Sequence, residues 1–541
     1  MSIKMLAPSE IWADYEPEGS PINLQLLNKR GNLERYTFDA DIQSQPTPIY
    51  ARVNRAKGQA HTILIAGSYY APTDESLTDN LVSCGYNVVE IDYTGIFPDS
   101  ATAYPQDFSY GHIEQAGSHL TKLQESALDT SLYLYTKVFR RAITFTRELI
   151  GWGKIILLGI KEGADVAICA AGLDRRADGL VCLNGAAYSE YLQYNYHDPS
   201  NNPEKEEERI AYLMGASSSA YAKLIRCPVV IGVGSNSESV DIDRLANFLS
   251  LLPEDVERVF TITPRAKDYI DNFSYNAVRN SIGSIIEKKP LASNPLIKEK
   301  LQEEDLYLYI TERSGLKPES VGVYISFCEN DRRYRNYVYQ SCEMAGVGEY
   351  ITKVPQACGE VLAFGEVIYE DGSRLSTLPV YVETEEQDEA ATPVKRLLYS
   401  NTDSEHTFAA VTSLPVLFGE GIKRIKNKLG LTELSSATND LITYEIGDAA
   451  YVKEGALLQI ELKNASENDI EVILGEVREG RLKEYFLSLE ADAAEETFEV
   501  FTIEAQDAKD KELIALKDFS MVKYIRIKGE KPFAIGNIIL I

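Results

Sequence analysis

The stretch KIILLGIKEGADVAICAAGL, residues 154–173, predicts a buried strand, a tight turn and a buried helix in immediate succession. Its first part is a continuous run of Ile and Leu, as expected of a strand covered on both faces. Its second part is rich in alanine and predicts a helix that ends at Gly172. Gly159 and Gly163 flank the turn, where glycine permits strained torsions and close packing of the backbone. A strand that leads directly into a helix favours an α/β sheet with crossover helices.

The same alternation of short apolar runs and longer helical periodicities extends from about residue 60 to residue 288. This pattern is typical of a mostly parallel sheet with connecting helices. One long helix is expected after Asp129 or Thr130, either of which is a suitable N-cap. Another ends at Gly85. The first half of the chain is therefore predicted to be one α/β domain.

Composition changes after the linker EKKPLASNP, residues 287–295. Apolar and polar residues then alternate with a period of two, which predicts antiparallel strands, and Asp371-Gly372 predicts a hairpin turn. The fold class is therefore α/β, with a mostly parallel sheet followed by two β-sandwich domains. We expect an N-terminal extension packed on the α/β domain at 1–60, the α/β domain at 61–290, a small Ig-like sandwich at 291–413 and a jelly-roll-like sandwich at 414–541.

Charge and composition restrict the classes of partner. The chain has 541 residues, with 54 Lys and Arg against 82 Asp and Glu, for a formal net charge of −28. Nucleic-acid binding is not expected, because phosphate contacts need a concentrated basic surface. No apolar run approaches 18 residues and no secretory signal is visible, so we predict a cytoplasmic protein without a membrane span. The seven cysteines have no metal-ligand spacing, and no metal or cofactor is expected.

Four features resemble the α/β-hydrolase superfamily, and more narrowly the acetylxylan-esterase-like branch of carbohydrate esterases. They are the segments at 9–27, 91–95 and 104–117, and the Gly-x-x-x-Gly turn at 159–163. The resemblance covers roughly half of the chain. The C-terminal sandwich is similar in pattern to carbohydrate-binding modules. The resemblance implies a nucleophile at the tip of the turn, a carboxylate after a later strand and a histidine after the last strand of the sheet.

None of the three implied catalytic residues is present. Lys161 stands at the tip of the turn, Ser237 at the position of the acid and Asp268 at the position of the histidine. An amine forms Schiff bases with carbonyl compounds rather than productive acyl-enzymes. Without an imidazole to accept the proton, a hydroxyl near neutral pH is a poor nucleophile. The simultaneous loss predicts a catalytically degenerate site.

Substitutes for these residues exist elsewhere in the sequence. Glu238, Asp241 or Asp243 is an alternative acid near Ser237. A second alternative is a relocated nucleophile at Ser68, in the loop after the first strand of the parallel block, with His112 or His119 as its base. The more economical interpretation of Ser68 is a turn residue that bonds to the local backbone.

A cluster of tyrosines provides a candidate ligand site. Tyr191, Tyr194 and Tyr196 follow the strand after which hydrolases often carry a cap, and tyrosine rings can stack on sugars. The alternative is that they pack this insertion against the domain. We expect a protein whose catalytic site is degenerate, and we favour the absence of enzymatic activity. The expected role is to bind a carbohydrate or small-molecule ligand, or a structural one. An active carboxylic ester hydrolase of the acetylxylan type, and a homo-oligomer, are the alternatives.

Overall fold

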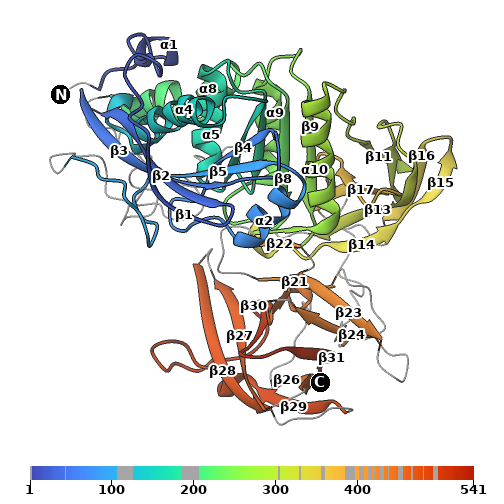
Figure 1. Cartoon of the computed structure of the whole chain (residues 1–541). Coiled ribbons are helices and arrows are strands. Elements are labelled where there is room, and N and C mark those ends of the chain that lie inside the picture. The colour runs from blue at the N-terminus through green and yellow to red at the C-terminus, as the bar shows by residue number, and fades with distance from the viewer. Residues whose placement is uncertain are drawn as a thin grey trace.

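The computed structural model describes residues 3–541 except 43, 106–125, 186–205, 303–304, 328–330, 355–359, 384–396, 401–406, 412–416, 420, 427–431, 437, 449–454, 465–466, 479–480 and 492–496. Its centre is a nine-stranded sheet (Figure 1). The last six strands in the order are mutually parallel, and each of the first three runs antiparallel to the strand that follows it in the order. The order is β1 (Gln25–Arg30), β2 (Leu33–Ile42), β3 (Gln45–Asn54), β5 (Asn87–Asp92), β4 (Thr62–Ala66), β6 (Ile155–Ile160), β7 (Gly179–Leu183), β8 (Val229–Gly234) and β9 (Arg258–Thr263).

Helices cover both faces of this sheet, as the alternating pattern predicts. One face packs against α4 (Ser131–Ile150), α5 (Gly163–Leu173), α8 (Ser219–Ala222) and α9 (Leu245–Leu251). The other packs against α2 (Glu75–Ser83) and α10 (Asn272–Glu287). Two further helices are α1 (Pro8–Ile11) and α7 (Glu206–Ala211). Among the described helices, none is both long enough and apolar enough to cross a bilayer.

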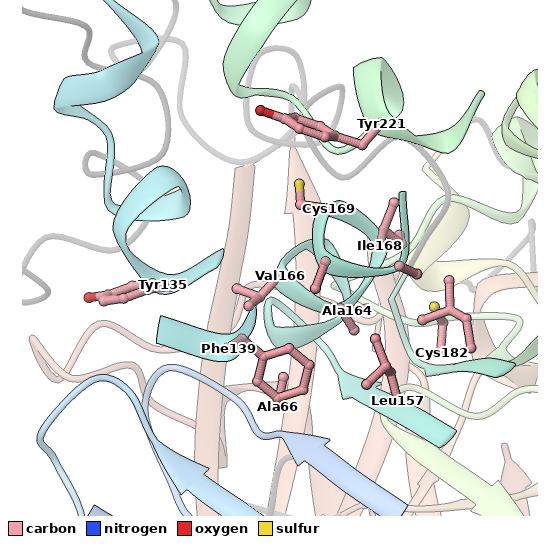
Figure 2. Packing of buried hydrophobic residues seen from close by; sticks show 14 of the residues in the cluster. Ala66, Tyr135, Phe139, Leu157, Ala164, Val166, Ile168, Cys169, Cys182 and Tyr221 are labelled. Carbon is pink, nitrogen blue, oxygen red and sulfur yellow. The ribbon is translucent and has the colours of Figure 1, made fainter. Parts of the chain in front are cut away.

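The strand, turn and helix at 154–173 form as predicted, with one difference. Helix α5 does not end at Gly172 but continues to Leu173. A Cβ atom at Gly172 would lie 2.7 Å from the carbonyl oxygen of Tyr221, so this glycine permits close approach of α8 rather than ending the helix. Figure 2 shows Ala164 and Cys169 of α5 among Leu157, Phe139 and Tyr221.

The N-terminal extension differs from its prediction. Residues 1–60 were expected to pack on the α/β domain, but residues 25–54 supply three strands of the sheet itself. Phe38 and Ile49 are completely buried in these strands. The extension is therefore part of the sheet, because its apolar residues need the same core to leave water.

A first sandwich follows and adjoins the last strand of the large sheet. At this edge, Ile262 donates its N–H to Ser376 Oγ at 2.9 Å, and the side chain of Asn294 bonds to both backbone groups of Phe260. These bonds cover an edge that would otherwise expose unpaired backbone groups. Asp371 and Gly372 form the predicted hairpin. The strands are β11 (Leu296–Gln302), β12 (Asp305–Thr311), β16 (Glu349–Val354) and β15 (Glu343–Gly346) in one sheet, and β14 (Val338–Ser341), β13 (Pro318–Phe327), β17 (Glu360–Tyr369), β18 (Arg374–Ser376) and β19 (Val380–Glu383) in the other.

The C-terminal sandwich begins earlier than the sequence predicts. Strands β20 (Leu397–Tyr399) and β21 (Ala409–Ala410), expected within 291–413, pair with C-terminal strands instead. One sheet contains β20, β23 (Ile422–Lys426), β24 (Thr432–Ser436), β31 (Phe533–Leu540), β26 (Leu457–Asn464) and β29 (Glu499–Glu504). The other contains β21, β25 (Asp440–Thr443), β30 (Val522–Gly529), β27 (Asn468–Arg478) and β28 (Arg481–Ala491). A short parallel pair, β10 (Tyr269–Asp271) with β22 (Leu417–Gly419), links this region to the α/β domain.

Candidate functional site

Lys161 occupies the tip of a strained turn between β6 and α5. Its φ angle is +50°, in the left-handed region that costs a residue with a side chain about 1–2 kcal/mol. Glycine is required at positions 159 and 163 because neighbouring atoms leave no room for a Cβ atom. A Cβ atom at Gly163 would lie 2.2 Å from the carbonyl oxygen of Ala66, and one at Gly159 would lie 2.4 Å from Ala164 Cα. The turn therefore has the tight geometry that the glycine spacing predicts.

The structure brings the three predicted positions together. Lys161 Nζ lies 2.8 Å from Asp268 Oδ2, and Ser237 Oγ donates to Asp268 Oδ1 at 3.5 Å. The lysine and aspartate side chains are only 18% and 15% exposed. Each residue follows a different strand, Lys161 after β6, Ser237 after β8 and Asp268 after β9. The three positions that the family resemblance implies are thus connected in space.

The chemistry of this cluster is that of an ion pair. Burial raises the pKa of Asp268 above its ordinary value, and the positive charge of Lys161 opposes that rise. An ammonium group that donates to a carboxylate has no free lone pair with which to attack a carbonyl carbon. The Ser237 hydroxyl bonds to a carboxylate rather than to an imidazole. The cluster therefore combines an ammonium, a carboxylate and a hydroxyl in one connected set.

The histidines do not complete the cluster within the described part of the chain. His61 precedes β4, stacks on Trp152 and accepts a hydrogen bond from the N–H of Lys154. The proposed substitutes His112 and His119 lie outside the described residues, as do Tyr191, Tyr194 and Tyr196 of the candidate ligand site.

Ser68 has a carboxylate partner. Its hydroxyl donates to Glu162 Oε2 at 2.9 Å and accepts from the N–H of Tyr70 at 3.4 Å. Ser68 is buried, and Glu162 directly follows Lys161 in the turn. The sequence-based alternative paired Ser68 with a histidine, whereas the described partners are a carboxylate and the local backbone.

The loop after β8 is held by the first sandwich. The Asn236 side-chain amide donates to the carbonyl of Arg335 at 2.9 Å, and the Arg332 guanidinium donates to the carbonyl of Ser237. Arg335 also makes two parallel bonds to Asp243, at 2.8 and 2.9 Å. Paired bonds of this kind are among the strongest that side chains form.

The alternative acids are likewise engaged in structural contacts. Asp243 binds Arg335, Asp241 lies 3.8 Å from Arg332 Nε, and Glu238 Oε1 lies 2.9 Å from Lys267 Nζ. None of the three bonds to a histidine in the described part of the structure. The sequence signal for these contacts is the segment DRRYRNY at 331–337, in which three arginines stand among the apolar strands of a sandwich.

The loop after β9 is held by the C-terminal sandwich. Arg265 Nη2 lies 3.0 Å from Glu445 Oε1, and both side chains are buried. Lys267 Nζ lies 5.5 Å from the centre of the Tyr524 ring, and Tyr334 stacks on the same ring. Both loops that border the Lys161 cluster are therefore anchoring points for the sandwiches. Within the described residues, no group of three or more His, Cys, Asp or Glu side chains is placed to hold a metal ion.

Comparison with known proteins finds similarity in structure only. No family model and no curated protein matches the sequence. Acetyl xylan esterase 1 from Thermoanaerobacterium sp. is 16% identical, with a TM-score of 0.39 over 49% of this chain and 89% of that chain. An acetyl xylan esterase from Paenibacillus sp. is 16% identical, with a TM-score of 0.38 over 50% and 90%. Est1E from Butyrivibrio proteoclasticus is 14% identical, with a TM-score of 0.31 over 47% and 96%. The chain itself has a mostly parallel sheet covered by helices on both faces, with a strained turn after β6, followed by antiparallel β-sandwich domains.

Proposed function

We propose that this chain is a catalytically degenerate α/β-hydrolase-fold protein whose former reactive centre is a structural ion pair. The observation that carries the proposal is the 2.8 Å contact between Lys161 Nζ and Asp268 Oδ2. It joins the position of the nucleophile to the position of the histidine, and the two groups satisfy each other electrostatically. The Ser237 hydroxyl donates to Asp268, but the positive charge of Lys161 favours the ionised carboxylate and so weakens it as a base for that hydroxyl.

The contacts of the neighbouring loops support the same proposal. The loops that carry Ser237 and Asp268 also carry Asn236, Asp243 and Arg265, which bind the two sandwiches. Their hydrogen bonds are used to fix three domains in one arrangement. We therefore assign to this region a structural role, and to the whole chain a role in binding a ligand or a partner.

A specific contact favours the second candidate, an active carbohydrate esterase of the acetylxylan type. Ser68 Oγ lies 2.9 Å from Glu162 Oε2, beside the turn. The group beside Ser68 is thus a carboxylate and not the imidazole that most often serves as general base for a serine hydroxyl. For this reason we rank the esterase second.

The deciding experiment measures hydrolysis by the purified full-length protein. The substrates are p-nitrophenyl acetate and acetylated xylan, and the variants are Lys161→Ala and Ser68→Ala. We expect the wild-type rate to equal that of the buffer. Turnover that Ser68→Ala abolishes would establish the esterase instead, and turnover that Lys161→Ala abolishes would establish a reactive lysine.

A further inference from the structure

A cavity of about 600 Å³ lies where the three domains meet. Residues 263–273 of the α/β domain line one part of it, strands β13, β17 and β18 a second part, and residues 408–410 and 421–423 a third. The residues that line it do not include Lys161, Ser237 or Asp268. Its volume is in the range of small-molecule sites, which often occur at domain interfaces.

A buried charged cluster forms one wall of this cavity. The Arg374 Nη1 atom donates to Asp271 Oδ2 and, at 3.2 Å, to Ser274 Oγ, and Arg374 Nε lies 2.8 Å from Glu366 Oε2. Lys423, which is exposed, adds a second cation to the lining. The formal charges of these four lining residues, two acidic and two basic, balance. The groups hold one another in fixed positions, so a ligand meets polar atoms that are already ordered.

Aromatic rings form the remaining walls. The lining contains Tyr269, Phe273, Tyr324, Tyr339 and Phe408. Phe273 is 38% exposed, which is unusual for a phenylalanine, and the guanidinium of Arg374 lies 5.4 Å from the centre of its ring. The exposed ring offers an apolar face to a ligand, and the buried guanidinium beside it fixes the ring's position.

We propose that this cavity binds an uncharged saccharide of one or two rings. A pyranose has an apolar face of C–H groups that stacks on aromatic rings, and a rim of hydroxyl groups that both donate and accept. Asp271, whose side chain is 21% exposed, can accept from such a rim and Lys423 can donate to it, while the buried Arg374 holds Asp271 in place. A free anion would meet the carboxylate of Asp271, and a free cation would meet the ammonium of Lys423. This site is separate from the turn at Lys161 and does not depend on whether that turn is active.

The test is isothermal titration calorimetry on the full-length protein. The neutral probes are D-glucose, D-xylose and cellobiose, and the charged probes are D-glucuronate and D-glucosamine. At least one neutral sugar is expected to bind at one site per chain and more tightly than the charged probes. Phe273→Ala is expected to weaken binding about three- to tenfold, the usual value of an aromatic contact.

A control and a second variant keep the test decisive. Tyr307→Ala changes a half-buried tyrosine on β12, outside the cavity, and is expected to leave the affinity unchanged. Lys423→Ala changes an exposed residue, so the fold tolerates it, and it is expected to weaken binding through loss of a donor. The proposal is overturned if no neutral sugar binds at tens of millimolar, if a charged probe binds more tightly, or if Phe273→Ala and Lys423→Ala both leave the affinity unchanged.

Discussion

Removing one partner of the Lys161–Asp268 pair should destabilise the α/β domain. At 2.8 Å, Coulomb's law with an effective dielectric constant of about 20 gives a gross attraction of about 6 kcal/mol. Desolvation of the two groups offsets much of this attraction. Loss of one partner from a fully buried pair costs about 3–5 kcal/mol, because the other charge is left uncompensated. Since water reaches 18% and 15% of these side chains, we expect about 2–3 kcal/mol for Lys161→Met or Asp268→Asn.

The two tryptophans of the chain make the measurement selective. Trp12 and Trp152 both lie in the α/β domain, so their fluorescence during urea unfolding reports on that domain alone. The double variant should lose less stability than the sum of the single variants, with a coupling of about 1–2 kcal/mol. The matched control is Lys289→Met, which breaks an ion pair with Glu287 whose side chains are 68% and 57% exposed. An exposed pair contributes about 0–1 kcal/mol.

The pH dependence gives the same pair a second signature. In Lys161→Met the carboxylate of Asp268 stays buried without its cation, so its folded-state pKa rises further above the unfolded value. The folded state then binds the proton more tightly than the unfolded state. The contribution of Asp268 to the stability of this variant is therefore fully present below the unfolded-state pKa and is lost as the pH rises through the folded-state pKa. Single variants whose effects simply add, or a Lys161→Met loss no larger than that of Lys289→Met, would refute the ion-pair argument.

Three further outcomes are expected. Lys161→Gly should be about 1 kcal/mol more stable than Lys161→Ala in the same urea assay, because glycine adopts the φ angle of +50° without strain; equal stabilities would show that the turn relaxes. Arg265→Met leaves Glu445 buried without its cation and should speed proteolytic release of the C-terminal sandwich, whereas Lys289→Met should not. The triple variant Lys161→Ser, Asp268→His and Ser237→Asp should hydrolyse p-nitrophenyl acetate about tenfold faster than the wild-type chain, since a base for the hydroxyl is restored. The same rate in Lys161→Ser alone would show that the other two positions contribute nothing.

The local pattern of the sequence was sufficient to predict the turn and its neighbours. The apolar run from Ile155 and the glycines at 159 and 163 specify a buried strand, a tight turn and a buried helix, because each property depends on residues close in the chain. The family resemblance refers to positions at the ends of strands, and locating those ends by periodicity led to Ser237 and Asp268, which the structure joins to Lys161. Local periodicity is thus enough where a position is defined by the end of a strand.

The contacts between domains were not predictable in this way. Arg265 and Glu445 are separated by 180 residues, and Asn236 and Arg335 by 99. A period of two identifies the two faces of a sheet but not which element each face meets. Strands β20 and β21, with three and two residues, are too short to show a period, and for that reason they were assigned to the wrong sandwich. The cavity between the three domains escaped prediction for the same reason.

The polar groups of Lys161, Asp268 and Ser237 complement one another in charge and in hydrogen bonding. A single substitution, such as lysine for the nucleophile beside an intact histidine, would leave a buried cation near a second group that is itself easily protonated, at a cost in stability. Here the position of the histidine carries a carboxylate that compensates the lysine, and the position of the acid carries a hydroxyl that donates to that carboxylate. Every polar group in the chain of three retains a partner of the correct sign. Such a set satisfies the requirements of a buried polar network, in which each member holds its neighbour in place and an unpaired member would be costly.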